Sequence, residues 1–268
     1  MERTKFLFDH FVILTPDLPD AVRRYGELGF TVSPGGKHAG GKSENAIIAF
    51  SDGTYLELLA FIPAVLERKI KGLAKIGLLP FAMLGKTKMA QRFIKQAASK
   101  NGLIDFAVRP AETAARLNTI LPDELNFSEA IPGSRIKPDG QEVHWEMAFP
   151  KSLDAPFVCA DLTPHNLRVP EGAACEHANG VLGVESLEFA SPDFENEAAF
   201  YQKLFGGGIE EGDSRRQLRL GGSSLVLTPA RDGEKTAIRF STSSDGGAGK
   251  LADAYLGQNF ELFLKPRK

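Results

Sequence analysis

The chain has 268 residues, enough to bury a sizeable core as one large domain or two smaller ones. Its 32 basic and 34 acidic residues are nearly balanced, which gives no sign of a nucleic-acid-binding protein. Two cysteines, Cys159 and Cys175, are too few for a disulfide framework, and no apolar run approaches the roughly 20 residues that span a bilayer. With no secretory signal at the N-terminus, these features predict a cytoplasmic protein without a membrane partner.

The first pattern is a buried strand that leads directly into a helix. His10 begins an apolar run over Phe11 to Leu14, which predicts a strand covered on both faces. The segment Thr15-Pro16-Asp17 predicts a turn and a helix N-cap, because the Asp17 carboxylate can accept hydrogen bonds from free backbone N–H groups. The helical spacing that follows ends at Gly29, a residue that readily takes the left-handed conformation.

Three further strands and a loop are predicted after this helix. They are a strand over Phe30 to Ser33, a Gly- and Lys-rich loop over Pro34 to Ser43, and two strands, Ala46 to Phe50 and Thr54 to Ala60, joined by a turn at Asp52-Gly53. Glu57 is a single carboxylate among apolar neighbours in the last strand. Burial of such a charge is costly unless it is paired or binds a metal, so Glu57 is a candidate functional residue.

The segment from Phe61 to Asn101 predicts two helices with nine basic residues against the single acid Glu67, a net charge of +8. One interpretation is a solvated helical face. The other is a lid that attracts an anionic substrate or partner. The sequence leaves both interpretations open.

A fainter middle unit follows this basic segment. Its predicted elements are strands over Leu103 to Val108, Phe127 to Ile131, Gln141 to Phe149 and Pro156 to Leu162, with a helix over Ala111 to Leu121. His144 and Glu146 are two residues apart, so on a strand they share one face. Asp161 is the other polar candidate of this unit.

An internal repeat relates the end of the chain to its beginning. Ser191-Pro192-Asp193 matches Thr15-Pro16-Asp17, and the segment Gly222 to Leu227 matches Gly53 to Leu58. The third unit is therefore a shortened copy of the first. It lacks the functional residues, because Ser186 stands at the position of His10 and Val226 at that of Glu57.

The repeated βαβββ pattern, the strand around Asp9-His10 and the run Tyr55-Leu56-Glu57-Leu58 resemble the vicinal oxygen chelate superfamily, which includes glyoxalase I, extradiol dioxygenases and bleomycin-resistance proteins. The motif pieces that resemble its glyoxalase-like subfamily are Gly35-Gly36-Lys37-His38 through Asn45, Pro156 to Pro164, and His177-Ala178-Asn179-Gly180. The resemblance implies an α+β fold of βαβββ modules in half-open barrels. We expect two modules over residues 1–165, with the insert at 61–101, and a third, degenerate module over 180–268, with a possible homodimer.

The resemblance also implies a divalent metal held by His10 and Glu57. Asp161 stands where the subfamily often has a histidine, and this His-Glu-Asp set favours Mn²⁺, Fe²⁺, Zn²⁺ or Ni²⁺. Structural alternatives exist for each residue: a hydrogen-bonded His10, an ion pair between Glu57 and a nearby Lys or Arg, and an Asp161 that organises the turn at Thr163-Pro164.

Five further polar residues complete the predicted site. His144 and Glu146 are candidates for proton transfer, since an imidazole exchanges protons near neutral pH, although a strand-surface position is the alternative. His38 and Asn45 flank the Gly-rich segment and are candidate substrate-binding residues or ordinary loop residues. His177 is a candidate for substrate binding or for stabilising the linker into the third module.

These features predict a metal-dependent lyase, isomerase or dioxygenase that acts on a small oxygenated substrate. The metal would stabilise an enolate-like intermediate as a Lewis acid. The alternative is a metal-free protein that sequesters a small molecule, as bleomycin-resistance proteins do, because fold alone does not determine function. A third possibility is a scaffold whose basic insert binds a partner.

Overall fold

A closed eight-stranded barrel forms the first part of the computed structural model, which describes residues 5–112, 117–137, 139–206, 209–212, 214–231, 236–243, 248–251 and 260–266. The strand order around the barrel is β1-β4-β3-β2-β6-β7-β8-β5. Its strands are β1 (Phe6–Leu14), β2 (Ser33–His38), β3 (Ser43–Ala49), β4 (Tyr55–Phe61), β5 (Gly102–Pro110), β6 (Ile131–Ile136), β7 (Glu142–Ala148) and β8 (Phe157–Asp161). The expected α+β class is confirmed, but this sheet is closed and not half-open.

Two modules of similar topology build the barrel. In the first, β1 pairs in parallel with β4, and in the second, β5 pairs in parallel with β8. The modules join through two antiparallel pairs, β1 with β5 and β2 with β6. Side chains that point inward from both modules therefore meet inside one barrel.

The first helix, α1 (Leu18–Glu27), begins as its sequence predicts. The Asp17 side chain accepts a hydrogen bond of 2.9 Å from the backbone N–H of Asp20, and Gly29 has a positive φ of 87°. Four short helical segments lie elsewhere in the first two thirds of the chain: α5 (Leu117–Ile120), η1 (Asp123–Leu125), α6 (His165–Arg168) and η2 (Gly172–Cys175). Part of the predicted helix over Ala111 to Leu121 lies outside the described residues.

Strand β2 corrects the prediction of a loop over Pro34 to Ser43. The chain over Ser33–His38 is a strand between β3 and β6, and its glycines permit this pairing. Gly36 has a φ of 133°, and a Cβ there would lie 2.3 Å from the carbonyl oxygen of Ile136. Gly36 is therefore required for the close approach of β2 and β6, which joins the two modules.

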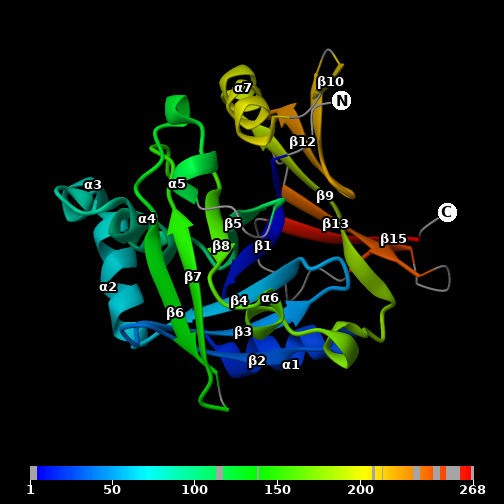
Figure 1. The fold of residues 1–268 in the computed structure, drawn as a ribbon. Helices are drawn as coiled ribbons and strands as arrows, with labels where there is room; N and C mark the ends of the chain where they lie inside the picture. The colour runs from blue at the N-terminus through cyan, green and yellow to red at the C-terminus, as the bar shows by residue number, and fades with distance from the viewer. Residues whose placement is uncertain are drawn as a thin grey trace.

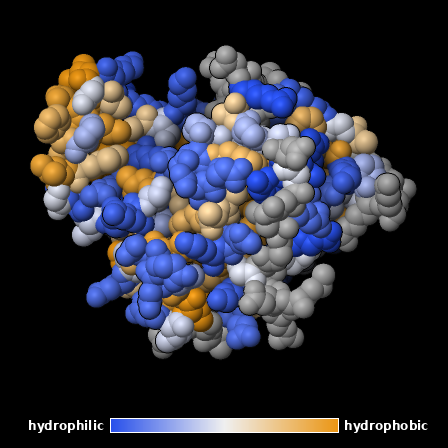
Figure 2. Space-filling view, turned by 90° about the horizontal axis from the view of Figure 1, so that it is seen from above, coloured by the Kyte–Doolittle hydropathy of each residue, from blue (hydrophilic) through white to orange (hydrophobic). Residues whose placement is uncertain are grey.

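The basic insert folds into three helices, where the sequence predicts two: α2 (Ala64–Lys75), α3 (Leu79–Met83) and α4 (Lys88–Ala98). They lie beside one end of the barrel, at the left of Figure 1. Arg92 on α4 is buried and ion-paired with Asp105 on β5, which fixes the insert to the barrel. Phe81 and Leu84 are 72% and 78% exposed, and apolar surface gathers at the same side of the molecule in Figure 2.

A second mixed sheet of seven strands, at the right of Figure 1, has the order β10-β11-β12-β9-β13-β15-β14. Its elements are β9 (Val181–Ser191), α7 (Phe194–Phe205), β10 (Ile209–Gly212), β11 (Arg215–Leu220), β12 (Ser223–Pro229), β13 (Thr236–Thr242), β14 (Gly249–Lys250) and β15 (Phe260–Pro266). Among the described residues no helix is long and apolar enough to cross a membrane.

The register of the second sheet repeats that of the barrel. Opposite His10 on β1 lies Tyr55 on β4, and at the equivalent place Ser186 on β9 lies opposite Ser224 on β12. Val226 pairs with Glu188 just as Glu57 pairs with Val12. The third unit therefore keeps the backbone of the first without its His and Glu. The domain boundaries given above stay a prediction.

Arg168, which is fully buried at the end of α6, connects three strands of the barrel. Its guanidinium donates hydrogen bonds of 2.8 Å to both carboxylate oxygens of Asp9 on β1 and to the hydroxyl of Tyr55 on β4. It also donates to Asp161 on β8. Burial disfavours its charged form, but the charge and hydrogen bonds of Asp9, together with the other polar groups around it, outweigh this effect and raise the pKa of Arg168.

Replacement of Arg168 is expected to destabilise the whole barrel. Arg168→Met removes the cation that bonds both oxygens of the fully buried Asp9 and leaves only Arg109, 4.0 Å away, which costs on the order of 3–5 kcal/mol of unfolding free energy. Urea denaturation followed by circular dichroism measures this loss. The control Arg23→Met removes only exposed ion pairs and should leave the urea midpoint close to that of the wild type. Equal losses in the two variants would contradict the central role of Arg168.

Candidate functional site

A cavity of about 620 Å³ lies inside the barrel next to the insert. Apolar side chains from both form much of its lining: Val12, Leu59, Phe61, Leu66, Ile70, Phe93, Trp145, Met147, Phe149 and Phe157. Polar side chains of the first module gather in the same lining, and we call His10, His38, Asn45 and Glu57 the polar cluster. A pocket with apolar walls and a few convergent polar groups is typical of small-molecule sites.

A β-bulge positions His10. Phe8 pairs with Val108 and His10 with Ala107, so Asp9 is an extra residue in β1. Both Asp9 and His10 are buried, and His10 Nδ1 lies 2.6 Å from Asp9 Oδ2. Asp9 is ionised, because Arg168 and His10 outweigh the effect of burial and hold the pKa of this carboxyl well below its usual value. With Nδ1 bonded to this carboxylate, the Nε2 atom is left to face the cavity.

Glu57 lies at the centre of the polar cluster. Its Oε1 accepts a hydrogen bond of 2.6 Å from Asn45 Nδ2 and lies 3.4 Å from His38 Nε2, while its Oε2 lies 3.7 Å from His10 Nε2. Burial opposes ionisation of Glu57, but the hydrogen bond and charge of His38, the charge of His10 and the bond from Asn45 together lower its pKa to about 2. Glu57 is therefore a buried anion at neutral pH.

Gly35 makes room for the polar cluster. A Cβ at this residue would lie 2.0 Å from Asn45 Oδ1, so only glycine allows Asn45 to reach Glu57. Beyond it on the same strand, His38 Nδ1 lies 2.9 Å from the Ser43 hydroxyl, which directs Nε2 toward Glu57. His38 and Asn45 thus line the cavity, but their substrate-binding role stays a prediction.

The second module contributes side chains that sequence reasoning missed. Trp145 on β7 and Arg135 on β6 both line the cavity. A Cβ at Gly133 would lie 2.4 Å from Trp145 Nε1, so the indole lies directly against this glycine. No motif in the sequence marks Arg135. A buried Asp9 does predict a cationic partner, but nothing in the sequence identifies Arg168 among 32 basic residues.

The predicted metal ligands do not come together. His10 and Glu57 face each other, but Asp161 bonds to His165 Nδ1 at 2.7 Å and to Arg168, and it does not line the cavity. These contacts lower the pKa of Asp161 against the effect of burial. In the described part of the chain no group of three or more His, Cys, Asp or Glu side chains is arranged to hold a metal ion. The ligand set does not fit the implied metal, because Arg168 already neutralises Asp161.

The proposed proton-transfer residues lie outside the cavity. Trp145 and Met147 point inward from β7, so His144 and Glu146 point outward, and neither lines the cavity. His144 is half exposed and lies 3.2 Å from Glu142, while Glu146 accepts a hydrogen bond from the backbone N–H of Leu117. We therefore assign no chemistry to them.

His177 joins the first module to the linker. Its Nδ1 accepts a hydrogen bond of 3.0 Å from the backbone N–H of Thr31, and its Nε2 donates one of 3.0 Å to the carbonyl of Ala49. Burial lowers its pKa. Asn179 donates to the carbonyl of Leu28 in the same region. His177 does not line the cavity, so its contacts favour the structural alternative.

A family of proteins described by its glyoxalase-like domain matches residues 8–205, about three quarters of the chain. The chain belongs to this family. The match covers both barrel modules and continues to the end of α7. No curated protein matches the sequence significantly.

Solved structures share the fold of the glyoxalase-like protein at low sequence identity. A hypothetical protein from Staphylococcus aureus is 14% identical with a TM-score of 0.70, and the alignment covers 98% of this chain and 100% of that one. An Mn(II)-bound glyoxalase from Novosphingobium aromaticivorans is 11% identical with a TM-score of 0.55, over 99% and 83%. The 2,3-dioxygenase LapB from Pseudomonas sp. KL28 is 12% identical with a TM-score of 0.54, over 99% and 94%. These similarities show that the chain shares its fold with a glyoxalase and with a 2,3-dioxygenase.

The ionised Glu57 predicts a loss of stability at low pH. Its pKa is about 2 in the folded protein against 4.5 ordinarily, so its stabilisation is complete above pH 4.5 and is lost as pH falls through 2. The shift corresponds to on the order of 3 kcal/mol. We expect the wild type to lose more unfolding free energy than Glu57→Gln between pH 5 and pH 2, measured by urea titration. The exposed control Glu27→Gln should show the same pH dependence of unfolding free energy as the wild type. The same pH dependence in all three proteins would refute the prediction.

The ligand arrangement predicts a metal content well below one equivalent. Inductively coupled plasma mass spectrometry of protein purified without chelator or affinity metal measures this, before and after incubation with Mn²⁺, Fe²⁺, Zn²⁺ or Ni²⁺. Near-stoichiometric metal that is lost in both His10→Ala and Glu57→Ala would contradict the expectation. In that case Asp161→Asn is the informative control, because it removes a ligand of the set expected from the sequence.

Proposed function

We propose that the glyoxalase-like protein is an enzyme that transfers a proton on a small carbonyl compound bound inside the barrel. The observation that supports this is the polar cluster, an ionised carboxylate with two imidazoles in an otherwise largely apolar cavity. Buried ionisable groups that converge in a cavity are costly, and they are common at catalytic sites.

His10 is the proposed base. The Asp9 carboxylate accepts the Nδ1 proton, which leaves Nε2 with a free lone pair in the neutral ring. The 3.7 Å between Nε2 and Glu57 Oε2 is longer than a hydrogen bond, so Nε2 is available to a substrate proton. After proton uptake the imidazolium would lie between the carboxylates of Asp9 and Glu57, which stabilise it.

His38 is the proposed acid, which would donate a proton of its own while His10 holds the proton that it removed. Its Nε2 lies 3.4 Å from the other oxygen of Glu57, so the two imidazoles approach the same carboxylate from different strands. A proton removed from a carbon beside a carbonyl by one ring could be replaced on a neighbouring atom by the other. This is the chemistry of an isomerase or a lyase. The Lewis-acid route expected from the sequence needs a ligand set that these residues do not form.

The alternative is sequestration without chemistry, which the extensive aromatic and aliphatic lining of the cavity favours. Under this alternative the polar cluster would only orient a bound molecule. Both functions require binding in the cavity, but only the enzyme exchanges substrate protons with solvent.

Solvent exchange distinguishes the two functions. We expect the wild type in D₂O to accelerate deuterium incorporation beside the carbonyl of 4-phenyl-2-oxobutanoate or 1-hydroxy-4-phenylbutan-2-one, followed by proton NMR. His10→Gln should lower the exchange rate about 100-fold or more, since it removes the base. His144→Ala, which changes an exposed residue on the outer face, should exchange as the wild type does. Tight binding of these compounds without accelerated exchange would favour sequestration.

A further inference from the structure

Arg135 on β6 has an incompletely bonded guanidinium in the cavity. The residue is 4% exposed, and one terminal nitrogen donates a hydrogen bond of 2.6 Å to the carbonyl oxygen of Arg168. Its Nε is buried without a hydrogen-bond partner. Among the described residues no carboxylate forms an ion pair with it. A buried donor on a charged group is costly unless a ligand completes its bonding.

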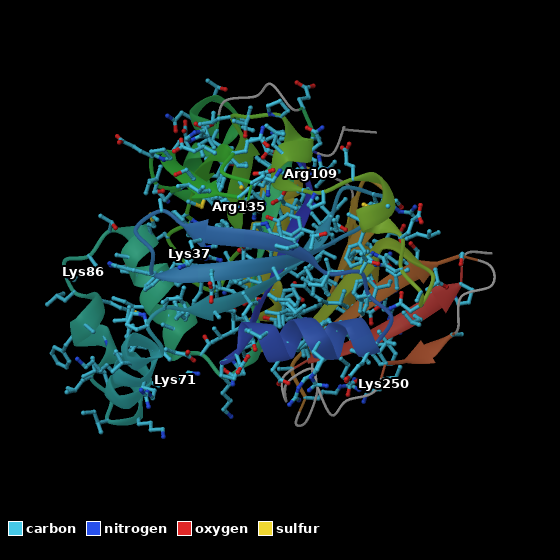
Figure 3. All side chains as sticks on the ribbon, turned by 90° about the horizontal axis from the view of Figure 1, so that it is seen from below. Lys37, Lys71, Lys86, Arg109, Arg135 and Lys250 are labelled. Carbon is cyan, nitrogen blue, oxygen red and sulfur yellow. The ribbon has the colours of Figure 1, made fainter. Side chains whose placement is uncertain are left out.

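The position of Arg135 relates it directly to the polar cluster. It lies opposite His38 in the pairing of β2 with β6, so the two side chains share the inner face of the barrel. Burial lowers the pKa of Arg135, while the negative charge of Glu57 favours its charged form. Figure 3 labels Arg135 among the barrel strands, far from Lys86 at the outer end of the insert.

The charges around the cavity favour an anion. Five of the described lining residues are Lys or Arg, and Glu57 is the one carboxylate among them. Arg92 and Arg168 are already neutralised by Asp105 and by Asp9 with Asp161. Of the remaining three cations, Lys42 and Lys86 are exposed, so Arg135 is the buried one.

We propose that Arg135 binds the carboxylate of the substrate, and that the substrate class is an apolar or aromatic 2-oxo carboxylic acid. The guanidinium would bond a carboxylate oxygen through Nε, placing the adjacent carbonyl carbon near His10 and His38. The hydrocarbon part would lie against Trp145 and the apolar wall. The assignment of the 2-oxo group rests on the proposed function, whereas carboxylate binding by Arg135 does not.

Tryptophan fluorescence tests the carboxylate site directly, because Trp145 is the single tryptophan and lines the cavity. The probes are 4-phenylbutanoate and its uncharged analogue 4-phenylbutanamide, neither of which can react. We expect the wild type to bind the carboxylate at least about tenfold more tightly than the amide, the factor typical of one charge-assisted hydrogen bond. Arg135→Gln should lose this preference, and Arg135→Lys should retain only part of it, because Lys lacks Nε.

The control Lys37→Gln removes an exposed cation on β2 that does not line the cavity, and it should keep the preference. Equal affinity of the wild type for both probes, no binding of either, or an unchanged preference in folded Arg135→Gln would overturn the proposal. The affinities of the wild type for the two probes test the proposal even if a variant does not fold. A rise in melting temperature with the carboxylate but not with the amide provides a second readout. A carboxylate preference without deuterium exchange would refute the proposed enzymatic function but would still support the carboxylate-binding site at Arg135.

Discussion

The buried contact between Arg168 and Asp9 is the interaction on which the rest of the structure depends. Two hydrogen bonds of 2.8 Å connect α6 to the first strand, and Asp9 in turn holds the His10 ring. The carbonyl oxygen of the same Arg168 accepts a bond from Arg135. One charged side chain and its own backbone therefore position both a proposed base and a proposed anion-binding group. Since both charges are fully buried, separating them is costly, which makes the arrangement rigid.

The two barrel modules have unequal parts in the site. The first supplies the polar cluster, whereas the second supplies Trp145, Arg135 and the short helix that ends in Arg168. The third unit keeps the strand register of the first but has Ser186 and Val226 in place of His10 and Glu57. A similar strand arrangement thus recurs among the described residues while the polar cluster occurs in the first module, so the side chains and not the topology determine where the polar cluster forms.

The sequence predicted the features that depend on local patterns. The Asp17 cap and the apolar strands follow from capping and periodicity, whereas the resemblance to the vicinal oxygen chelate superfamily is what implied that His10 and Glu57 lie together. Prediction from the sequence failed where contacts between segments far apart in the chain determine the structure. Gly35 and Gly36 suggest a loop by composition, but β3 and β6 hold them in a strand. Asp161 has the chemistry of a ligand, and only the fold brings Arg168 and His165 to it. His144 was assigned to one face of a strand correctly, but the pattern did not say that this face is the outer one.

The insert has a consequence for how such a protein can diversify. Leu66, Ile70, Met89 and Phe93 form part of the cavity wall, and all four come from one continuous segment between β4 and β5. The polar cluster comes entirely from barrel strands, and Arg92 with Asp105 is a buried ion pair that joins the two parts. This part of the cavity wall and the polar cluster are therefore encoded in separate stretches of the chain. Exchange of this one segment would change the shape of the cavity, while the polar cluster stays intact.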